Sequence, residues 1–172
     1  MILNKKKGIL FWITGLSGAG KTSISNKIYK RIKDKYGKTF YINGDEMRKI
    51  FDLKSYDNSD RKKGGIKYSK LFKKITDQNI NVLFAGMALF HDVRKWNRTN
   101  LENYIEIYIK TSLKKIIKKK YKKIYKRKTQ LVGIDLKPEF PKKPDIIINN
   151  YFNKSIEKLS DELFIKINKK LN

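Results

Sequence analysis

The sequence predicts an α/β fold with three layers, in which a mostly parallel five-stranded sheet carries helices on both faces. Short apolar runs alternate along the chain with segments of helical periodicity, an order that implies right-handed crossovers between parallel strands. One run, residues 80–85, is apolar almost throughout, as is typical of a strand covered on both faces. A glycine-rich segment follows the first run, at the place where such sheets bind their ligands.

The individual elements follow from these patterns. Strands are expected at residues 9–13, 38–42, 80–85, 104–109 and 144–149. The first helix places Ile24, Ile28 and Ile32 on one face, and Gly37 ends it. Further helices are expected over about residues 60–77, 113–128 and 155–171. Their expected buried residues include Ile66, Leu71, Phe72 and Ile75 in the helix 60–77, and Ile156, Leu159, Leu163 and Ile167 in the last helix.

Length and composition limit the class of protein. The chain has 172 residues, enough for one core, and we expect a single domain over residues 1–172. It contains no cysteine, which excludes disulfides and thiolate zinc sites. Its one histidine, His91, argues against a histidine metal site or a Ser-His-Asp triad. No segment approaches the roughly 18 apolar residues of a membrane span, so we expect a cytoplasmic protein.

The formal net charge of +26 would suit nucleic acid or an anionic membrane. The 42 basic residues include only six arginines, however, and the lysines occur with many isoleucines and asparagines, a mixture typical of an AT-rich genome. We therefore favour solvated lysine faces and expect neither a membrane nor a nucleic acid as partner. The positive field should still attract small anionic molecules.

Residues 15–22, Gly-Leu-Ser-Gly-Ala-Gly-Lys-Thr, match the phosphate-binding loop pattern G-x-x-x-x-G-K-[ST] between an apolar run and a helix. Glycines let successive backbone N–H groups turn towards a triphosphate, and the helix N-terminus adds its dipole. Lys21 would reach the β- and γ-phosphates, and the Thr22 hydroxyl would ligate Mg²⁺. The expected nucleotide-binding residues are Gly15, Ser17, Gly18, Ala19, Gly20, Lys21, Thr22 and Ser23.

A bound triphosphate permits hydrolysis coupled to motion or phosphate transfer to an acceptor. The chain has no Asn-Lys-x-Asp guanine motif and is short for a motor ATPase, which favours transfer. Transfer needs a second pocket that holds an acceptor hydroxyl in line with the γ-phosphate. Asp45 could accept the hydroxyl proton or hold Mg²⁺ through water, and Arg48 and Arg61 could bind an anionic acceptor. The alternative interpretations are a helix cap for Asp45 and surface charge for the arginines.

Five segments resemble the adenylylsulfate kinase family in order and approximate spacing. They are residues 15–22, Asn-Gly-Asp-Glu-Met-Arg at 43–48, Ser-Asp-Arg at 59–61, Lys-Lys-Ile-Tyr-Lys at 122–126 and Val-Gly-Ile-Asp at 132–135. The resemblance covers about residues 9–150 and implies a P-loop kinase fold. It also implies an enzyme that moves the γ-phosphate of ATP, with Mg²⁺, to the ribose 3′-hydroxyl of a nucleotide, which in this family is adenylyl sulfate.

The resemblance implies roles for individual residues. Lys21, Asp45 and Arg61 would be catalytic, with Asp45 as the base or as a carboxylate that organises the metal. Arg48 and Arg61 would anchor the anionic bridge of the acceptor, and Tyr56 would stack on its base. A lid at about residues 113–135 would close over both nucleotides and exclude water. The implied acceptor-binding residues are Asp45, Arg48, Tyr56, Arg61, Met87 and, in the lid, Lys122 and Ile124.

Departures from the family pattern lie on the acceptor side. Gly64 replaces an asparagine that helps to bind adenylyl sulfate. Ala88 and Leu89 replace a Ser-Pro pair, and Lys123 replaces a lid glycine. This asymmetry suggests a different nucleotide acceptor.

One group that resembles adenylylsulfate kinases phosphorylates the ribose 3′-hydroxyl of cytidine diphosphoramidate in bacterial capsule biosynthesis, and we take this activity as the leading hypothesis. An adenylylsulfate kinase of sulfate assimilation is the alternative. A non-catalytic nucleic-acid-binding protein that uses the basic helix 113–128 is a more remote one. The resemblance also implies a possible homodimer.

Overall fold

The predicted three-layer α/β fold is confirmed in the computed structural model, which describes residues 4–55, 57–118 and 132–172. All strand pairs are parallel, and the strand order is β2-β3-β1-β4-β5. The strands are β1 (Leu10–Thr14), β2 (Thr39–Asn43), β3 (Asn81–Ala85), β4 (Tyr104–Lys110) and β5 (Ile146–Asn149). Each lies within two residues of its predicted position.

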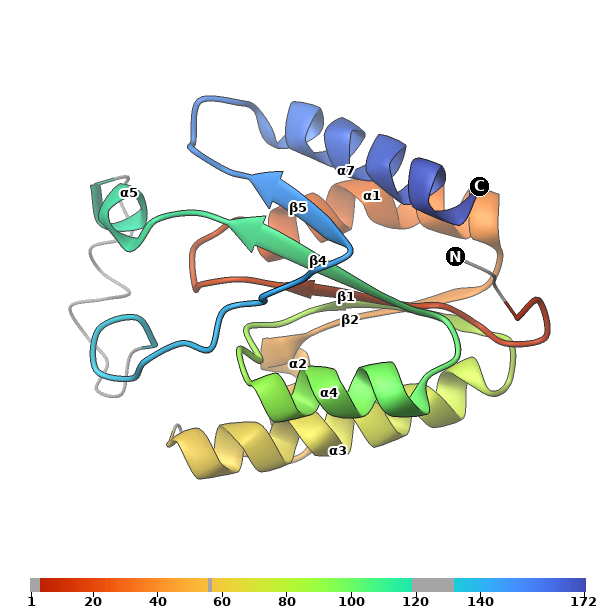
Figure 1. The fold of residues 1–172 in the computed structure, drawn as a ribbon, viewed down its shortest axis with the longest axis horizontal. Helices are drawn as coiled ribbons and strands as arrows, with labels where there is room; N and C mark the ends of the chain where they lie inside the picture. Colours follow the sequence, from red (N-terminus) through yellow and green to blue (C-terminus); the bar gives the residue numbers. More distant parts are fainter. Residues whose placement is uncertain (1–3, 56, 119–131) are drawn as a thin grey trace.

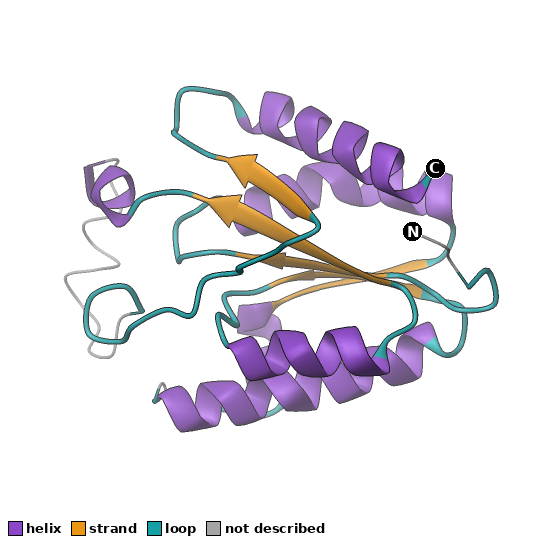
Figure 2. Cartoon of the chain, viewed as in Figure 1, coloured by secondary structure: helices purple, strands orange, loops and turns teal. Residues whose placement is uncertain are grey.

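Helices cover both faces of the sheet, as Figures 1 and 2 show. They are α1 (Lys21–Tyr36), α2 (Gly44–Ile50), α3 (Asn58–Thr76), α4 (His91–Asn100), α5 (Leu113–Lys118) and α7 (Ile156–Leu171). Helices α1 and α7 lie on one face, whereas α2, α3 and α4 lie on the other. Helix α5 follows β4 at the carboxyl edge of the sheet, and the rest of the helix predicted over 113–128 lies outside the described residues.

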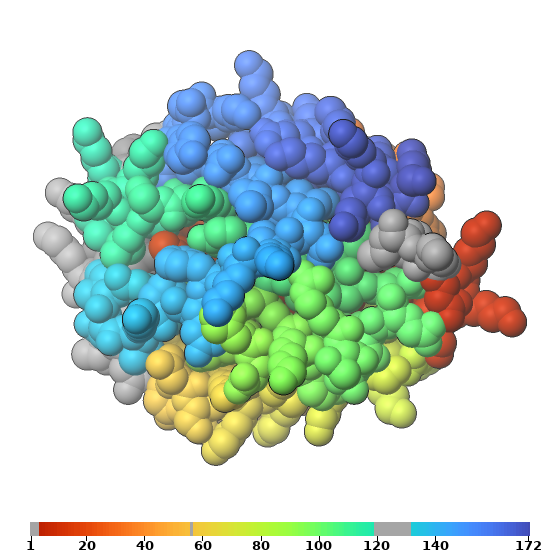
Figure 3. All heavy atoms as spheres, viewed as in Figure 1, coloured from red at the N-terminus to blue at the C-terminus, as the bar shows by residue number. Residues whose placement is uncertain are grey.

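The core has one apolar cluster on each face of the sheet. On β1, Phe11 and Ile13 point towards α1 and α7, and Leu10 and Trp12 point towards α3 and α4. All four side chains are fully buried, so β1 is a central strand with two covered faces. In the space-filling view, α4, α7 and the segments around them pack against one another on this face (Figure 3).

The predicted inner face of α1 is confirmed, because Ile24, Ile28 and Ile32 have no exposed surface. Burial of each such side chain contributes about 1.5–3 kcal/mol to stability. The helix ends where Gly37 adopts φ +94°, in the left-handed region that glycine enters at little cost.

The predicted inner face of α3 is partly wrong. Phe72 is fully buried, and Ile66, Leu71 and Ile75 are partly buried and pack against the same cluster, but the most buried part of the face also includes Gly65 and Tyr68. The cause is the close packing of α4 on α3. A Cβ atom at Gly65 would lie 2.8 Å from Cγ2 of Val93, so the contact requires a residue without a side chain.

Two short helices were not predicted, since neither has an apolar stripe. Helix α2 begins in a polar segment, and α4 buries Arg94 and Asn97 beside Val93. Nε of Arg94 lies 3.2 Å from a carboxylate oxygen of Glu106 on β4, and this ion pair offsets part of the cost of burying the charge. A polar inner face of this kind gives no hydrophobic periodicity.

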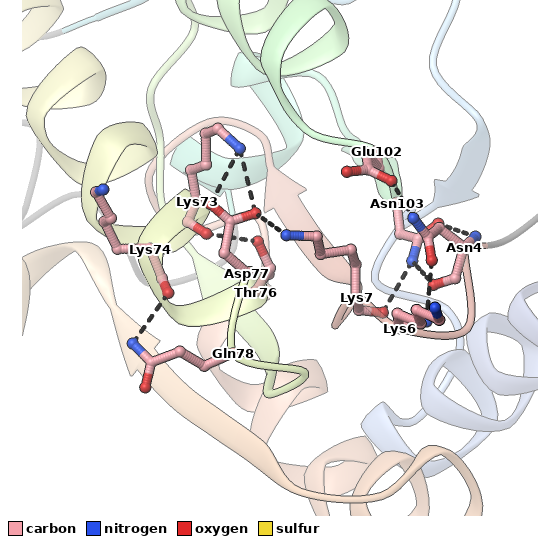
Figure 4. A network of polar contacts seen from close by, with 10 residues as sticks. All are labelled: Asn4, Lys6, Lys7, Lys73, Lys74, Thr76, Asp77, Gln78, Glu102 and Asn103. Atoms are coloured by element: carbon pink, nitrogen blue, oxygen red, sulfur yellow. Dashed lines mark hydrogen bonds and ion pairs between the residues drawn. The ribbon is translucent and has the colours of Figure 1, made fainter.

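A polar network ties the N-terminal segment to the amino end of the sheet (Figure 4). Nδ2 of Asn103 donates to the carbonyl oxygens of Asn4 and Lys7 at 2.8 and 2.9 Å. Nζ of Lys7 pairs with Asp77 at 3.0 Å. These contacts lie at the end of the molecule opposite the phosphate loop, and they leave the carboxyl edge open.

Candidate active site

The segment after β1 has the backbone of a phosphate-binding loop. Gly15, Gly18 and Gly20 have φ angles of +149°, +78° and +92°, which residues with a Cβ rarely adopt. A Cβ atom at Gly15 would lie 2.6 Å from the carbonyl oxygen of Ile109 on β4. The loop therefore folds back tightly against the sheet and turns its open side away from the core.

The N-terminus of α1 points into this loop without a capping side chain. Gly20 is the N-cap residue and makes no side-chain hydrogen bond, and the first turn holds no acidic residue. The first N–H groups of a helix lack intrahelical partners, and the helix dipole adds partial positive charge there. These N–H groups are suited to bind an anion such as phosphate.

Lys21 lies at the start of α1, and its Nζ donates a hydrogen bond of 2.8 Å to the carbonyl oxygen of Leu16 within the loop. Burial lowers the pKa of Lys21 to about 8, and the carboxylate of Asp45 opposes this shift. Desolvation disfavours the ammonium, which a phosphate would compensate. If Nζ of Lys21 donated to a phosphate oxygen instead of the Leu16 carbonyl oxygen, Lys21 would make the predicted contact with the phosphates.

Asn150 supports the loop from behind, and sequence reasoning missed it. It follows β5, is 2% exposed, and its Nδ2 donates to the carbonyl oxygen of Ala19 at 3.0 Å. Its Oδ1 accepts from the backbone N–H of Phe152 at 2.9 Å. The available signal was its place directly after a strand, at the carboxyl edge where ligands bind.

The loop borders a cavity that has several polar residues in its lining. Of the predicted nucleotide-binding residues, Gly15 and Ala19 lie behind the loop, whereas the others reach the cavity. The lining residues are Ser17, Gly18, Gly20, Lys21, Thr22, Ser23, Asn43, Gly44, Asp45, Ala85, Gly86 and Met87.

Helix α2 places Asp45 at the rim of this cavity. Oδ1 of Asn43 accepts hydrogen bonds from the backbone N–H groups of Asp45 and Glu46, both at 3.0 Å, and the Glu46 carboxylate accepts from the N–H of Asn43 at 2.9 Å. This capping box fixes the start of the helix. The interpretation of Asp45 as a helix cap is therefore wrong, because Asn43 has that role, and the exposed Asp45 side chain is available for chemistry.

A second cavity lies beside the first, between α2, α3 and the segment after β3. Asp45, Arg48, Arg61 and Met87 all line it, so these predicted residues come together. The full lining is Gly44, Asp45, Arg48, Asn58, Arg61, Gly65, Tyr68, Phe84, Gly86, Met87, Ala88, Leu89, Phe90, Val132, Lys137 and Pro138.

Arg48 also has a structural role. Its guanidinium donates to the carbonyl oxygens of Leu53 and Ser55, the latter at 2.6 Å. The guanidinium thereby holds the loop between α2 and α3, so the interpretation of Arg48 as mere surface charge is wrong. Arg48 also lines the second cavity.

The two cavities share Gly44, Asp45, Gly86 and Met87. A Cβ atom at Gly44 would lie 3.3 Å from Cα of Gly86, and a Cβ atom at Gly86 would lie 2.2 Å from the ring of Phe84. The two glycines therefore bring their main chains close together where the cavities meet, and Asp45 and Met87 lie beside them. Two anionic ligands, one in each cavity, would meet at this carboxylate.

Part of the predicted site lies outside the described residues, namely Tyr56, Lys122 and Ile124. Of the predicted lid, the structure describes α5 and the segment after it. Gly133 donates to the carbonyl oxygen of Leu136 at 2.8 Å, and Val132 packs with Leu16 of the phosphate loop, Leu89 and Ile116. This small apolar cluster connects the lid region to both cavities.

The donor atoms for a metal are few. Within the described ranges, no three His, Cys, Asp or Glu side chains gather to hold a metal by themselves. Thr22 and Asp45 both line the first cavity and offer a hydroxyl and a carboxylate. Mg²⁺ is commonly held by one or two such protein ligands together with substrate phosphates, so these residues fit it.

The site combines an uncapped helix N-terminus behind a glycine-rich loop with a second cavity that holds a carboxylate and two arginines. This combination defines a P-loop kinase. Comparisons with known proteins give the family, since the adenylylsulphate kinase family model matches residues 7–149. The chain belongs to the adenylylsulphate kinase family, and it is a phosphotransferase with an alcohol group as acceptor.

Individual relatives agree with this result. A cytidine diphosphoramidate kinase of Campylobacter jejuni is 34% identical over 167 residues, covering 94% of this chain and 97% of that protein. An adenylyl-sulfate kinase of Lactiplantibacillus plantarum is 30% identical over 157 residues, covering 86% and 75%. The Mycobacterium tuberculosis APS kinase CysC, solved with AMPPNP and APS, shares the fold with a TM-score of 0.83 at 22% identity, covering 94% and 98% of the two chains.

As far as the chain is described, its helices are all too short or too polar to traverse a lipid bilayer.

Proposed function

We propose that this protein transfers the γ-phosphate of ATP to the ribose 3′-hydroxyl of cytidine diphosphoramidate. The observation that carries the proposal is the 34% identity to a cytidine diphosphoramidate kinase, which extends over 94% of this chain and 97% of that protein. In capsule-building bacteria such a product would serve capsule decoration, as the sequence resemblance implies.

The acceptor cavity supports this choice over adenylyl sulfate. At Gly64, the side chain of Leu53 occupies the nearby space, with Cδ1 only 2.8 Å from where a Cβ atom would lie. An asparagine at this position, as the adenylylsulfate kinase pattern has, would require the Leu53 side chain to move. Position 64 thus offers no amide to an acceptor, while Arg48 and Arg61 still offer cations to a diphosphate-like bridge.

The reaction follows from the two joined cavities. The phosphate loop would hold ATP, and the acceptor's 3′-hydroxyl oxygen would attack the γ-phosphorus beside Asp45. The bond from this phosphorus to the β,γ-bridging oxygen breaks, ADP leaves, and the hydroxyl proton passes to the Asp45 carboxylate. Lys21 would stabilise the charge on the transferring group. Thr22 and Asp45 would hold Mg²⁺, which neutralises phosphate charge when bound.

The second candidate function is adenylylsulfate kinase, which the 30% identity to the Lactiplantibacillus plantarum adenylyl-sulfate kinase favours. The two candidates share the donor, the reaction and the carboxylate. They differ only in the acceptor, so a comparison of acceptors separates them.

The test uses the purified full-length protein with ATP, Mg²⁺ and either cytidine diphosphoramidate or adenylyl sulfate. Phosphorus NMR and mass spectrometry would locate the new phosphate, and initial rates would give kcat/KM for each acceptor. We expect a 3′-phosphorylated product and a higher kcat/KM for cytidine diphosphoramidate. A higher value for adenylyl sulfate would establish the second candidate instead.

Several expectations stay predictions. These are the single domain, the cytoplasmic location, the homodimer, closure of the lid at 113–135, and the binding roles of Tyr56, Lys122 and Ile124. The nucleic-acid alternative rests on the basic helix over 113–128, of which α5 is the described part. It predicts binding whose affinity falls steeply with salt concentration, which a titration with duplex RNA or DNA would reveal.

A further inference from the structure

Tyr68 stands in the wall of the acceptor cavity and was not among the predicted site residues. It lies on α3 seven residues after Arg61, so both side chains project from the same helix face, and both line the cavity. The Tyr68 ring is 6% exposed and packs against the rings of Phe51 and Phe84, at centroid distances of 5.6 and 6.1 Å. These contacts fix the direction of the phenol.

The absence of a side chain at Gly64 opens the space around the Tyr68 hydroxyl. Gly64 lies one helical turn before Tyr68, and helical side chains lean towards the N-terminus. A Cβ atom at Gly64 would lie 3.6 Å from this hydroxyl and 2.8 Å from Cδ1 of Leu53. Any larger residue at position 64 would therefore crowd the hydroxyl.

The Tyr68 hydroxyl has hydrogen-bonding capacity to spare. Across the described parts of the chain no hydrogen bond to it is formed, although the residue is buried. The hydroxyl does not belong to the fully buried polar atoms that lack a partner, so it reaches the open space of the cavity that Tyr68 lines. Burial raises the pKa of Tyr68, with Arg48 opposing and Asp45 adding to the shift, so the phenol remains a neutral donor near both charged groups.

We propose that Tyr68 is a specificity-determining residue, whose hydroxyl donates a hydrogen bond to the acceptor nucleotide in the stretch between its reacting hydroxyl and its anionic bridge. This inference rests on the proposed function, because in that function Asp45 lies beside the reacting hydroxyl and Arg48 beside the anionic bridge. Gly64 and Tyr68 act together, since the glycine makes room for the hydroxyl that the tyrosine supplies.

The test compares Tyr68→Phe, which removes one oxygen atom, with Tyr29→Phe as a matched control. Tyr29 lies on α1 and donates to the carbonyl oxygen of Thr39 at 3.3 Å, away from both cavities. Titration calorimetry would measure the Kd of cytidine diphosphoramidate and of adenylyl sulfate, and kinetics would measure KM and kcat.

For Tyr68→Phe we expect Kd and KM for the preferred nucleotide to rise about three- to tenfold, as for the loss of one hydrogen bond. The KM for ATP, the kcat and the melting temperature should stay near the wild-type values, which a merely structural role would not allow. Tyr29→Phe should leave the Kd unchanged.

The outcomes separate the inference from the proposed function. A wild-type protein that binds a nucleotide without phosphorylating it overturns the proposed function, and the change in Kd still decides the role of Tyr68. Normal phosphorylation with an unchanged Kd in Tyr68→Phe overturns the inference alone. Binding of neither nucleotide overturns both.

Discussion

The two cavities meet at Asp45 but are built in different ways. The first cavity, the proposed ATP site and here called the donor cavity, takes half of its lining residues from one stretch, residues 17–23, around the start of α1. The second cavity, the proposed acceptor site and here called the acceptor cavity, is lined by residues from α2, α3, the end of β3 with the segment after it, and residues 132–138. One wall is thus local in sequence, and the other is assembled from four separate segments.

This difference corresponds to what each cavity recognises. Backbone N–H groups and a helix dipole bind phosphate whatever nucleoside carries it. Side chains such as Arg48, Tyr68 and Phe90 differ in charge, size and polarity, so they can distinguish one acceptor from another. Substitutions should therefore affect ATP on one side, the acceptor on the other, and both only at the junction.

The largest effect is expected on the donor side, from Lys21→Ala. Loss of the cation that faces the transferring phosphate should lower kcat about 1,000-fold, because backbone N–H groups alone would remain. Steady-state phosphate transfer measures this. Lys27→Ala is the matched control, since Lys27 is an exposed lysine on the same helix that pairs with Glu157. Equal losses in the two variants would contradict a specific role for Lys21.

At the junction, Asp45→Asn should lower kcat about 100-fold, because an amide cannot accept the hydroxyl proton. The KM values for ATP and acceptor should change much less, which single-turnover and steady-state kinetics would separate. Glu46→Gln is the control, since it removes the neighbouring negative charge while glutamine can still complete the capping box. A kcat for Asp45→Asn within fivefold of wild type would argue against Asp45 as the base.

On the acceptor side, Arg48→Ala should raise the acceptor KM about 10- to 100-fold and leave the KM for ATP nearly unchanged. It should also lower the melting temperature, because the carbonyl oxygens of Leu53 and Ser55 lose their donor. Arg31→Ala provides a comparison, since Arg31 pairs with Asp161 at 2.6 Å on the opposite face of the sheet. A rise in the KM for ATP instead would break the division between the two cavities.

The donor side should also respond to pH through Lys21, whose pKa is about 8. The kcat/KM for ATP should fall about tenfold per pH unit above this value, because the free enzyme loses the ammonium that binds phosphate. The profile of kcat should fall at higher pH, since bound phosphate favours the charged form.

Whereas kcat/KM falls as the pH rises, the stability of the fold should increase. The Lys21 pKa lies below its ordinary value of 10.5, so the unfolded chain binds more protons than the folded one between about pH 8 and 10.5. The free energy of unfolding should therefore increase as the pH rises across this window. Denaturant titrations of wild type and Lys21→Met at pH 7.5 and 10 would isolate it, and identical pH dependence in both would contradict it.

The smallest effect is expected for Asn150→Ala, which touches neither ligand. Loss of its hydrogen bond to Ala19 leaves a buried carbonyl oxygen unpaired and should cost about 1–3 kcal/mol of stability. The KM for ATP should rise only a few-fold, as the loop becomes less well positioned. Asn26→Ala, at an exposed position of α1, should change neither quantity.

The sequence predicted the donor side better than the acceptor side, for a physical reason. Residues 15–22 carry their own conformational signal, because glycines at defined spacing encode the loop. Tyr68 and Asn150 give no such signal, since their partners lie far away in sequence. Helix α4 escaped prediction because it buries Arg94 and Asn97, and the inner face of α3 was partly wrong because Gly65 provides the contact with α4.

The Gly44 and Gly86 pair has a consequence for how this architecture changes over evolutionary time. Because two glycines lie beside Asp45 and Met87 where the cavities meet, amino-acid replacements elsewhere in the acceptor cavity would leave the proposed transfer point intact. A new acceptor could then be recruited by exchanging a few side chains around an unchanged transfer point, so a change of selectivity would not require a change of chemistry.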